Sequence, residues 1–370
     1  MGMPEMKKDT SSTQRESRSE DAPVAIVTGA SAGVGRAIAK AFAQQRFRVG
    51  LLARSQAGLE GAREDVERLG GEPLTITADV SNSKEVDAAA REAADRWGHI
   101  DVWVNAAMET VVGPVDTISA EEFKRVTEVT YLGYVHGTLA ALRHMRPRCA
   151  GRIIQIGSAL SYRAIPLQSA YCACKFAIRG FTDSLRTELI HDRSGIRLTM
   201  VQLPGVNTPQ FDWSHMHFAH RHQPIGACYE PEAVAQAVVD VALSPDPPRE
   251  LWLGLPTLQA IAGAIAAPGF TDRYLARNSY EQQISNDPVL PGDPDELLGP
   301  DSRDHGARGR FTATAKNDLI TVDPYYLRSG ALLAGLGLLA GAYLFGRSRG
   351  ARARVRRRPN GAKSLASPRG

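Results

Sequence analysis

The sequence predicts an α/β protein built on a doubly wound, mostly parallel sheet. Between residue 24 and about residue 255, short runs rich in β-branched residues alternate with segments of helical length, as in strands joined by crossover helices. The first run, 24–28, is continuously apolar, which is typical of a strand buried on both faces. Right-handed crossovers would place helices on both sides of such a sheet.

Seven strands are expected in this region. They are predicted at residues 24–28, 47–53, 74–78, 101–105, 152–157, 196–202 and 250–253. The helices between them are predicted at residues 33–45, 56–69, 84–97, 121–145, 169–191 and 231–243. Sheet and helices together form one domain, residues 23–255, in a chain of 370 residues, of which 43% are hydrophobic.

Extensions flank this domain on both sides. Residues 1–22 are polar, mixed in charge and without an apolar core, so we expect a disordered arm rather than a secretory signal. Residues 256–328 form a C-terminal extension, with an apolar helix candidate at 256–267 and a segment rich in Pro, Gly and Asp at 286–310 that predicts a linker or a surface wrap. The four cysteines form no CxxC pair, which favours a reducing, cytoplasmic compartment.

The C-terminus combines an apolar run with a basic tail. Residues 330–346 are uncharged and apolar, and residues 347–370 hold nine Lys or Arg and no acid. Seventeen residues are the lower end for a helix that spans a bilayer. We therefore expect a membrane-associated helix at 329–346 that dips into or lies on the inner leaflet, followed by a basic tail at its surface. The alternatives are a helix that packs on the body and a disordered tail.

A glycine-rich segment directly follows the first predicted strand. Its sequence is Thr28-Gly29-Ala30-Ser31-Ala32-Gly33-Val34-Gly35. A turn from strand to helix needs glycine where φ is positive and where the backbone closely approaches a pyrophosphate. The N-terminus of the next helix offers N–H groups and a positive dipole end to that phosphate. Its place at the start of a long strand–helix series favours dinucleotide binding over a plain tight turn.

Tyr171 and Lys175 stand four residues apart, on one face of a predicted helix. A free tyrosine has a pKa of about 10 and is a poor base at neutral pH. A nearby ammonium group would lower that pKa, so that Tyr171 could exchange a proton with a carbonyl or alcohol oxygen. Ser158 ends the preceding strand, and its hydroxyl could hold the same oxygen. We therefore expect Ser158, Tyr171 and Lys175 to be catalytic.

Together these motifs resemble the classical short-chain dehydrogenase/reductase family, over residues 24 to 255. The resemblance implies a Rossmann fold, a nicotinamide cofactor, a small-molecule carbonyl or alcohol substrate, and a homo-oligomer without nucleic-acid partners. It also implies further cofactor contacts at Asp79 and Val80, at Asn105, and at Pro204, Gly205 and Thr208. Lys175 would in addition hydrogen-bond the nicotinamide ribose, and the glycine segment would bind through Thr28, Gly29, Ser31, Gly33, Val34 and Gly35.

The second predicted strand indicates which nicotinamide cofactor is bound. Enzymes that use NAD usually carry an acid at the end of this strand, to bind the free ribose 2′-hydroxyl. This chain has Arg54 there, followed by Ser55. A guanidinium can hold a 2′-phosphate through charge-assisted hydrogen bonds. We therefore expect NADP(H) to be preferred over NAD(H), against the alternative of a solvated surface arginine.

Two positions depart from the family pattern. Thr130 stands where the family has a fourth catalytic residue, an Asn, so a proton relay there would need the Thr130 hydroxyl and a water. Met108 replaces the glycine of the family's Asn-Asn-Ala-Gly segment and adds bulk beside the cofactor cleft. Both departures could instead support a rival interpretation: a catalytically quiet NADP(H)-binding scaffold at the membrane.

Four histidines crowd the segment after Thr208, which is the substrate lid in this family. They are His215, His217, His220 and His222. Imidazoles bind zinc, but no Cys or acid nearby in the sequence completes a plausible ligand set. We therefore expect lid contacts or plain surface, and no metal. The apolar segment 256–267 and the apolar C-terminus favour an apolar substrate.

Overall fold

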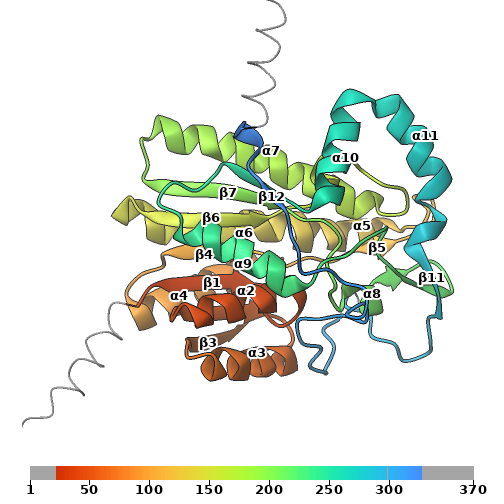
Figure 1. Ribbon diagram of the computed structural model, residues 1–370. Helices are drawn as coiled ribbons and strands as arrows, with labels where there is room; N and C mark the ends of the chain where they lie inside the picture. Colours follow the sequence, from red (N-terminus) through yellow and green to blue (C-terminus); the bar gives the residue numbers. More distant parts are fainter. Residues whose placement is uncertain (1–21, 298, 327–370) are drawn as a thin grey trace, which may run out of the picture. The chain divides into compact units, whose positions relative to one another are not determined.

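Eight strands form the central sheet, in the order β12-β10-β7-β6-β4-β1-β2-β3. Neighbouring strands among the last seven are parallel. These seven are β1 Val24–Thr28, β2 Arg48–Ala53, β3 Glu72–Thr77, β4 Val102–Asn105, β6 Gly151–Ile156, β7 Ile196–Gln202 and β10 Glu250–Leu253. The computed structural model describes residues 22–297 and 299–326 (Figure 1). The doubly wound α/β fold is confirmed.

The sheet has one strand more than the sequence predicted. β12, Thr321–Val322, pairs antiparallel with β10 and forms the edge of the sheet. With two residues in the strand, it leaves no periodic pattern in the sequence. Two small sheets lie outside the central one: β5 Val111–Val112 pairs with β8 His215–Met216, and β9 His220–His222 pairs with β11 Ile284–Pro288.

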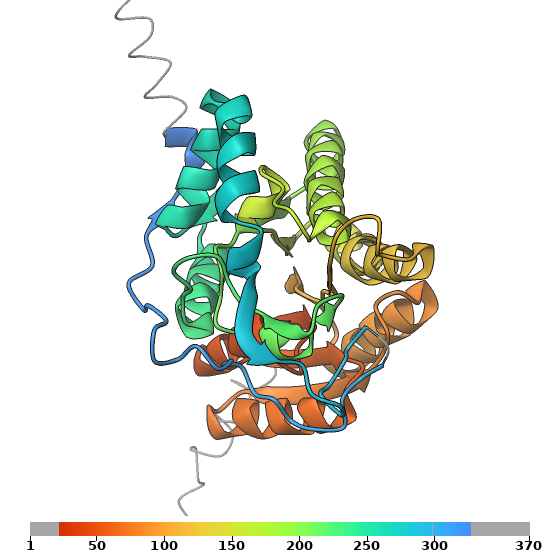
Figure 2. The same ribbon diagram turned by 90° about the vertical axis from the view of Figure 1, so that its right-hand side faces the viewer.

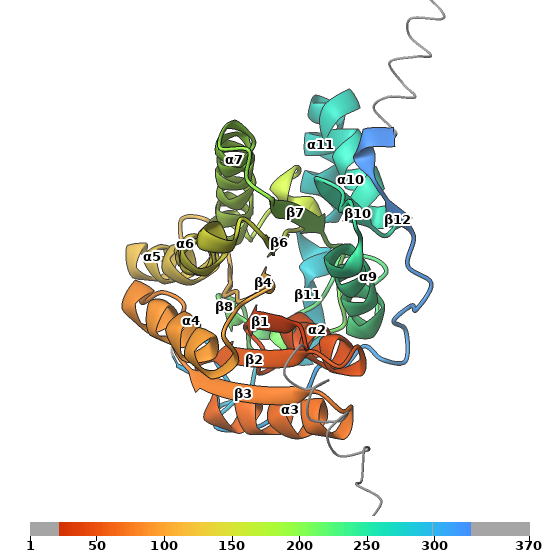
Figure 3. The same ribbon diagram turned by 90° about the vertical axis from the view of Figure 1, so that its left-hand side faces the viewer.

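Helices cover both faces of the central sheet (Figure 3). On one face lie α2 Gly33–Gln44, α3 Gln56–Arg68 and α9 Pro231–Leu243; on the other lie α4 Ser83–Trp97, α6 Gly133–Met145 and α7 Ser169–His191. Each layer buries its apolar stripe against the sheet, as burial of Phe42 on one side and Met145 on the other illustrates. The two resulting cores hold the strand ends, and hence the loops beyond them, in fixed positions.

The long helix expected at residues 121–145 is interrupted. It consists of α5 Ala120–Thr127, a π-helical turn η1 at Glu128–Leu132, and α6. Ser119 caps α5 in a capping box with Glu122, which fixes where the helix begins. A π-turn inserts a residue into the helix, and such turns often occur at functional sites. Here it lies where Thr130 faces the segment after β4.

Beyond β10, the chain forms α10 Leu255–Ala266, α11 Pro268–Asn278 and a 3₁₀ turn, η4 Glu281–Gln283, before β11. Residues 289–297 and 299–320, which we call the strap, then run back past α3 and the start of α2 to reach β12 (Figure 2). Hydrogen bonds hold the strap in place. The Ser55 hydroxyl donates to the carbonyl of Asp301 at 3.0 Å, and the N–H of Gly33 donates to the carbonyl of Gly306 at 3.1 Å. The segment rich in Pro, Gly and Asp is therefore a surface wrap.

Two predicted segments lie outside the described residues. They are the N-terminal arm, as far as residue 21, and the apolar helix 329–346 with its basic tail 347–370. Within the part of the chain that the structure describes, none of the helices has the length and apolar character needed to cross a membrane.

Candidate active site

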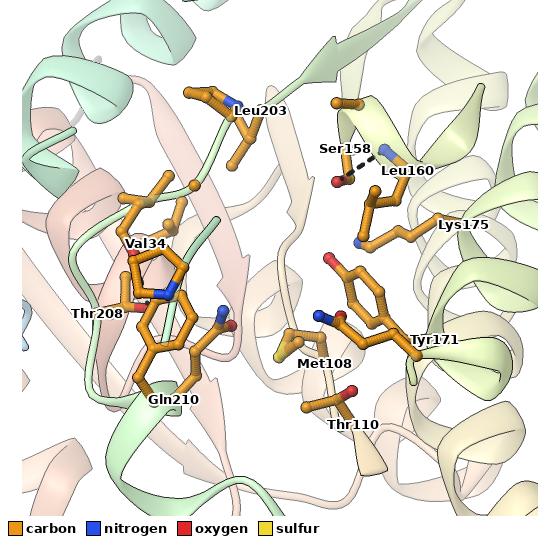
Figure 4. Close-up of a pocket in the computed structure, with 18 of the residues that line it drawn as sticks. Val34, Met108, Thr110, Ser158, Leu160, Tyr171, Lys175, Leu203, Thr208 and Gln210 are labelled. Carbon is orange, nitrogen blue, oxygen red and sulfur yellow. Dashed lines mark hydrogen bonds between the residues drawn. The ribbon is translucent and has the colours of Figure 1, made fainter. Parts of the chain in front are cut away.

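A cavity of about 1080 Å³ opens at the carboxyl ends of the parallel strands, where open α/β sheets bind their ligands. Its walls are the loops that follow β1, β2, β3, β4, β6 and β7. Fourteen of the predicted site residues line it: Gly29, Ser31, Gly33, Val34, Gly35, Arg54, Asp79, Val80, Ser158, Tyr171, Lys175, Pro204, Gly205 and Thr208. Figure 4 shows Ser158, Tyr171 and Lys175 on one side of the cavity, with Val34 and Thr208 opposite.

The glycine loop leaves no room for side chains. Gly29 has a φ of +69°, and a Cβ there would lie 2.8 Å from the Cα of Ala107. A Cβ on Gly35 would lie 2.2 Å from the carbonyl oxygen of Gly29. The loop therefore packs backbone against backbone, and α2 begins directly beyond it with no side-chain cap. Gly33, Val34 and Gly35, at the N-terminus of α2, line the cavity.

Thr28 and Asn105, which were predicted to contact the cofactor, lie behind the cavity wall and do not line the cavity. The Thr28 hydroxyl accepts a hydrogen bond from the N–H of Ala106 at 3.0 Å. Asn105 is fully buried and donates to Gln155 at 2.9 Å and to Thr138 at 3.1 Å. Both side chains satisfy buried polar groups between strands, so they position the loop after β4.

Arg54 is paired with two carboxylates, an arrangement that the sequence did not predict. Its guanidinium donates to Glu109, to the Glu296 carboxylate at 3.2 Å and to the Glu296 carbonyl at 2.8 Å. Glu109 is only 6% exposed. Burial raises the pKa of its carboxyl from 4.5 to about 8, against the opposing charge of Arg54. The candidate 2′-phosphate site therefore holds two acids from the loop after β4 and the strap.

Asp79 and Val80 line the cavity after β3. The Asp79 carboxylate accepts hydrogen bonds from Ser81 and, at 2.8 Å, from Arg125. Although burial opposes ionisation, these bonds hold the pKa of Asp79 below its ordinary value. Val80 packs against the face of α6 at Gly133, where a Cβ would come within 2.7 Å of it. The pair therefore forms a rigid rim to the cavity.

The Ser–Tyr–Lys group meets at one wall. α7 presents Tyr171 and Lys175 on the same face, with the Lys175 Nζ 5.4 Å from the centroid of the Tyr171 ring. The Ser158 hydroxyl follows β6, accepts a hydrogen bond from the Leu160 N–H at 3.1 Å, and lines the same cavity as Tyr171. Burial raises the pKa of Tyr171 above its ordinary value.

Lys175 is almost completely buried, with 2% of its surface exposed. Its Nζ donates to the carbonyl of Ile156 at 2.8 Å and to the hydroxyl of Tyr134 at 3.2 Å. Burial lowers the pKa of Lys175 to about 7. Tyr134, which the sequence analysis missed, donates to the same Ile156 carbonyl at 2.8 Å. It follows Thr130 by four residues, and that helical spacing is the signal that could have revealed it.

Thr130 does not line the cavity. Its hydroxyl exchanges hydrogen bonds with the backbone of Glu109, accepting from the N–H at 2.9 Å and donating to the carbonyl at 2.8 Å. The side chain is fully buried. Thr130 thus holds the segment that carries Met108 and Glu109. Met108 lines the cavity, where it adds bulk, as the sequence analysis expected.

Glu122 completes a cluster with two of the lid histidines. Its Oε1 lies 2.8 Å from the Nε2 of His215 and 3.0 Å from the Nε2 of His217. The sequence offers no nearby acid that completes a plausible set with these histidines, whereas α5 supplies one from 93 residues away in the chain. A hydrogen bond to Asp295 is the main cause that raises the pKa of His215. His222, in contrast, is buried, and desolvation lowers its pKa to about 3.

A glycine loop at a helix N-terminus and a Ser–Tyr–Lys group, facing each other across one cavity, define the class of oxidoreductase that works with a dinucleotide. Residues 23–215 match the family model of the short chain dehydrogenases. The chain belongs to this family, and it is an oxidoreductase.

Relatives and solved structures agree with this assignment. The chain is 29% identical over 334 residues to an uncharacterized oxidoreductase, YxnA, of Bacillus subtilis, over 86% of this chain and 90% of the relative. It is 34% identical over 185 residues to the putative oxidoreductase SadH of Mycobacterium tuberculosis, over 50% and 67%. An alcohol dehydrogenase from Thermococcus sibiricus, in complex with 5-hydroxy-NADP, superposes with a TM-score of 0.55 and 29% identity, over 63% of this chain and 96% of its own.

The actinorhodin polyketide ketoreductase, solved with NADPH, gives a TM-score of 0.55 and 28% identity, over 61% of this chain and 92% of its own. Both solved structures therefore match less than two thirds of this chain.

Proposed function

We propose that this protein transfers a hydride between NADP(H) and a carbonyl or alcohol, with Tyr171 as the proton donor and acceptor. The observation that carries the proposal is the common cavity: Ser158, Tyr171 and Lys175 share it with the glycine loop. Two structural neighbours, an alcohol dehydrogenase and a ketoreductase, were solved with NADP-type ligands. When bound, the nicotinamide would supply or accept the hydride.

The side chains of this site divide the proton chemistry among them. In the reductive direction, the Tyr171 hydroxyl gives its proton to the carbonyl oxygen, which the Ser158 hydroxyl holds by a hydrogen bond. The resulting Tyr171 phenolate gains from a neighbouring ammonium at Lys175, since opposite charges favour each other in a buried site. The pKa of Lys175, about 7 because of burial, leaves it able to take up a proton when that negative charge forms.

We propose a preference for NADP(H) on the basis of Arg54. The guanidinium stands at the end of β2, where a 2′-phosphate would lie, and lines the cavity. To bind the phosphate, Arg54 exchanges its contacts with Glu109 and Glu296 for the anion. Protonation of Glu109 would ease this exchange, because it removes one of the two competing charges.

An apolar substrate fits the remaining wall. α10 and α11 line the cavity through Leu255, Ala260, Phe270 and Tyr274, of which Phe270 is 71% and Tyr274 54% exposed. Large apolar side chains at the mouth of a cavity favour an extended apolar ligand. One relative, 30% identical over 191 residues and half of this chain, is the 3-dehydrosphinganine reductase of Danio rerio.

Membrane association of a cytoplasmic catalytic domain, through residues 329–346 and the basic tail, is part of the proposal and rests on sequence alone. The test compares the full-length chain with protein truncated before Leu327. The full-length chain should sediment with membranes and resist a high-salt wash, because salt screens charge but not apolar burial. Release by salt alone would leave only an electrostatic contact. A homo-oligomer is likewise implied by the family.

NADPH oxidation against a panel of ketones and aldehydes tests the proposed activity. Turnover with at least one apolar carbonyl compound is expected. Tight NADPH binding without turnover on any compound would favour the rival, a quiet cofactor-binding scaffold, for which Met108 in the cavity is the supporting observation.

A further inference from the structure

Three side chains from two distant segments of the chain, α5 and the lid, lie close together. Glu122 belongs to the first turn of α5, while His215 begins β8 and His217 directly follows that strand. The Nε2 atoms of the two imidazoles lie 2.8 Å and 3.0 Å from the Glu122 carboxylate, so both rings face α5. The candidate ligand atoms of the three residues all lie within 4.8 Å of one another. All three side chains are partly buried, with 15–23% of their surface exposed.

The separations are close to those of a metal's coordination shell. Zinc binds imidazole nitrogen and carboxylate oxygen at about 2.0–2.2 Å, so neighbouring ligands of a tetrahedral ion stand about 3.3 Å apart. Glu122 Oε1 lies 2.8 Å and 3.0 Å from the two Nε2 atoms. An outward movement of a few tenths of an ångström would admit the ion. Two imidazoles and one carboxylate also form a ligand set that zinc uses in proteins.

Two of the three ligand side chains, and the backbone of the third residue, are held by neighbouring groups, which is the second observation. Asp295, on the strap, lies with Oδ2 2.5 Å from the Nδ1 of His215, which leaves the Nε2 of that ring for a metal. The N–H of Ser119 donates to the second oxygen of Glu122 at 2.6 Å. The N–H of His217 donates to the carbonyl of Val112 at 2.9 Å. Metal ligands are commonly oriented by such outer contacts.

The backbone also makes room for His217. A Cβ on Gly113 would lie 2.7 Å from the Cβ of His217, so this close approach of β8 to the chain after β5 needs glycine there. β8 and β5 pair over only two residues each. Such a short pairing gives the lid little stability of its own, and a bridge between β8 and α5 would supply it.

We propose that Glu122, His215 and His217 bind one divalent cation of the zinc class, which ties the lid strand β8 to α5 with Asp295 as the outer-shell partner. The ion completes its coordination with water. Its role is structural: it closes the loop of chain between α5 and β8, and through Asp295 it anchors the strap beside Glu296, the residue that contacts Arg54.

Zinc titration of the tag-free, full-length protein after chelator treatment tests the site by calorimetry. We expect one Zn²⁺ per chain. His217→Ala and Glu122→Gln should lose this binding, and Asp295→Asn should weaken it by about 10–100-fold, as outer-shell changes do. His220→Ala is the matched control: His220 lies exposed on the same lid, outside the cluster.

Two further measurements distinguish a residue that binds the ion from a residue that is only needed for folding. Added Zn²⁺ should raise the Tm of wild type and His220→Ala but not of Glu122→Gln, and it should slow tryptic cleavage after Arg221 in the same two proteins. Co²⁺ should give the visible absorption of a four- or five-coordinate site only where Zn²⁺ binds. Wild type that binds no Zn²⁺, or Glu122→Gln and His217→Ala that bind it as wild type does, would overturn the proposal and leave the cluster as a hydrogen-bonded ion network.

Discussion

Replacement of Glu109 by glutamine should stabilise the protein in a pH-dependent way. The carboxyl is 6% exposed and faces Arg54, Glu296, Arg125 and Asp79. Burial, the largest effect, raises its pKa from 4.5 to about 8. Between these values the folded state holds a proton that the unfolded state has released. The stabilisation from the protonated form is therefore complete below pH 4.5 and is lost as pH rises toward 8.

The magnitude follows from the same two values. Each pH unit in this window contributes about 1.4 kcal/mol, so the wild type should lose on the order of 4–5 kcal/mol between pH 4.5 and pH 8 through this group. Glutamine resembles the protonated acid and does not titrate. The two proteins should thus have similar unfolding free energies near pH 5, and Glu109→Gln should be the more stable by several kcal/mol near pH 8.

Urea unfolding of both proteins at half-unit steps from pH 5 to 8.5 measures this difference. Glu64→Gln, a change at an exposed position of α3, serves as the control and should show a constant difference from wild type. A difference between Glu109→Gln and wild type that stays constant with pH, or that shrinks as pH rises, would refute the reasoning.

Three other changes have defined outcomes. Arg54→Ala should weaken NADPH binding by about 1.5–3 kcal/mol and leave NADH binding nearly unchanged; equal losses for both cofactors would remove Arg54 from the 2′-phosphate site. Gly35→Ala should distort the loop at about 1–3 kcal/mol and impair cofactor binding, whereas Gly180→Ala, with open space around it, should not. Thr130→Val should lower the unfolding free energy by about 1–3 kcal/mol, because it strands backbone groups of Glu109; an unchanged kcat in the folded variant would exclude a proton relay through Thr130.

The sequence predicted the features that local chemistry dictates. Strands such as β1 are apolar throughout because both faces of the sheet are covered, and that composition is visible without a structure. The glycine loop is equally local, since the clash at Gly35 arises six residues away at Gly29. Tyr171 and Lys175 could be identified from their helical spacing and their place after β6 alone.

The remaining features depend on contacts between distant segments. Glu109 is a charged residue in a loop, and nothing near it in the sequence indicates that the strap and Arg54 enclose it. Glu122 lies within the helix predicted at residues 121–145, and nothing near it in the sequence indicates that His215 comes within 2.8 Å of its carboxylate. Thr28 and Asn105 follow the family's motif but turn away from the cavity, a difference that only packing decides.

The central claim is that Tyr171 passes the proton in a hydride-transfer reaction, and Tyr171→Phe tests it most directly. The substitution keeps the ring in its place on α7 and removes only the hydroxyl. With an apolar ketone that the wild type reduces, single-turnover NADPH oxidation should fall by about 10²–10⁴-fold, the range of a lost general acid, while NADPH still binds with nearly unchanged affinity. A variant that binds NADPH normally and oxidises it at close to the wild-type rate would contradict the claim.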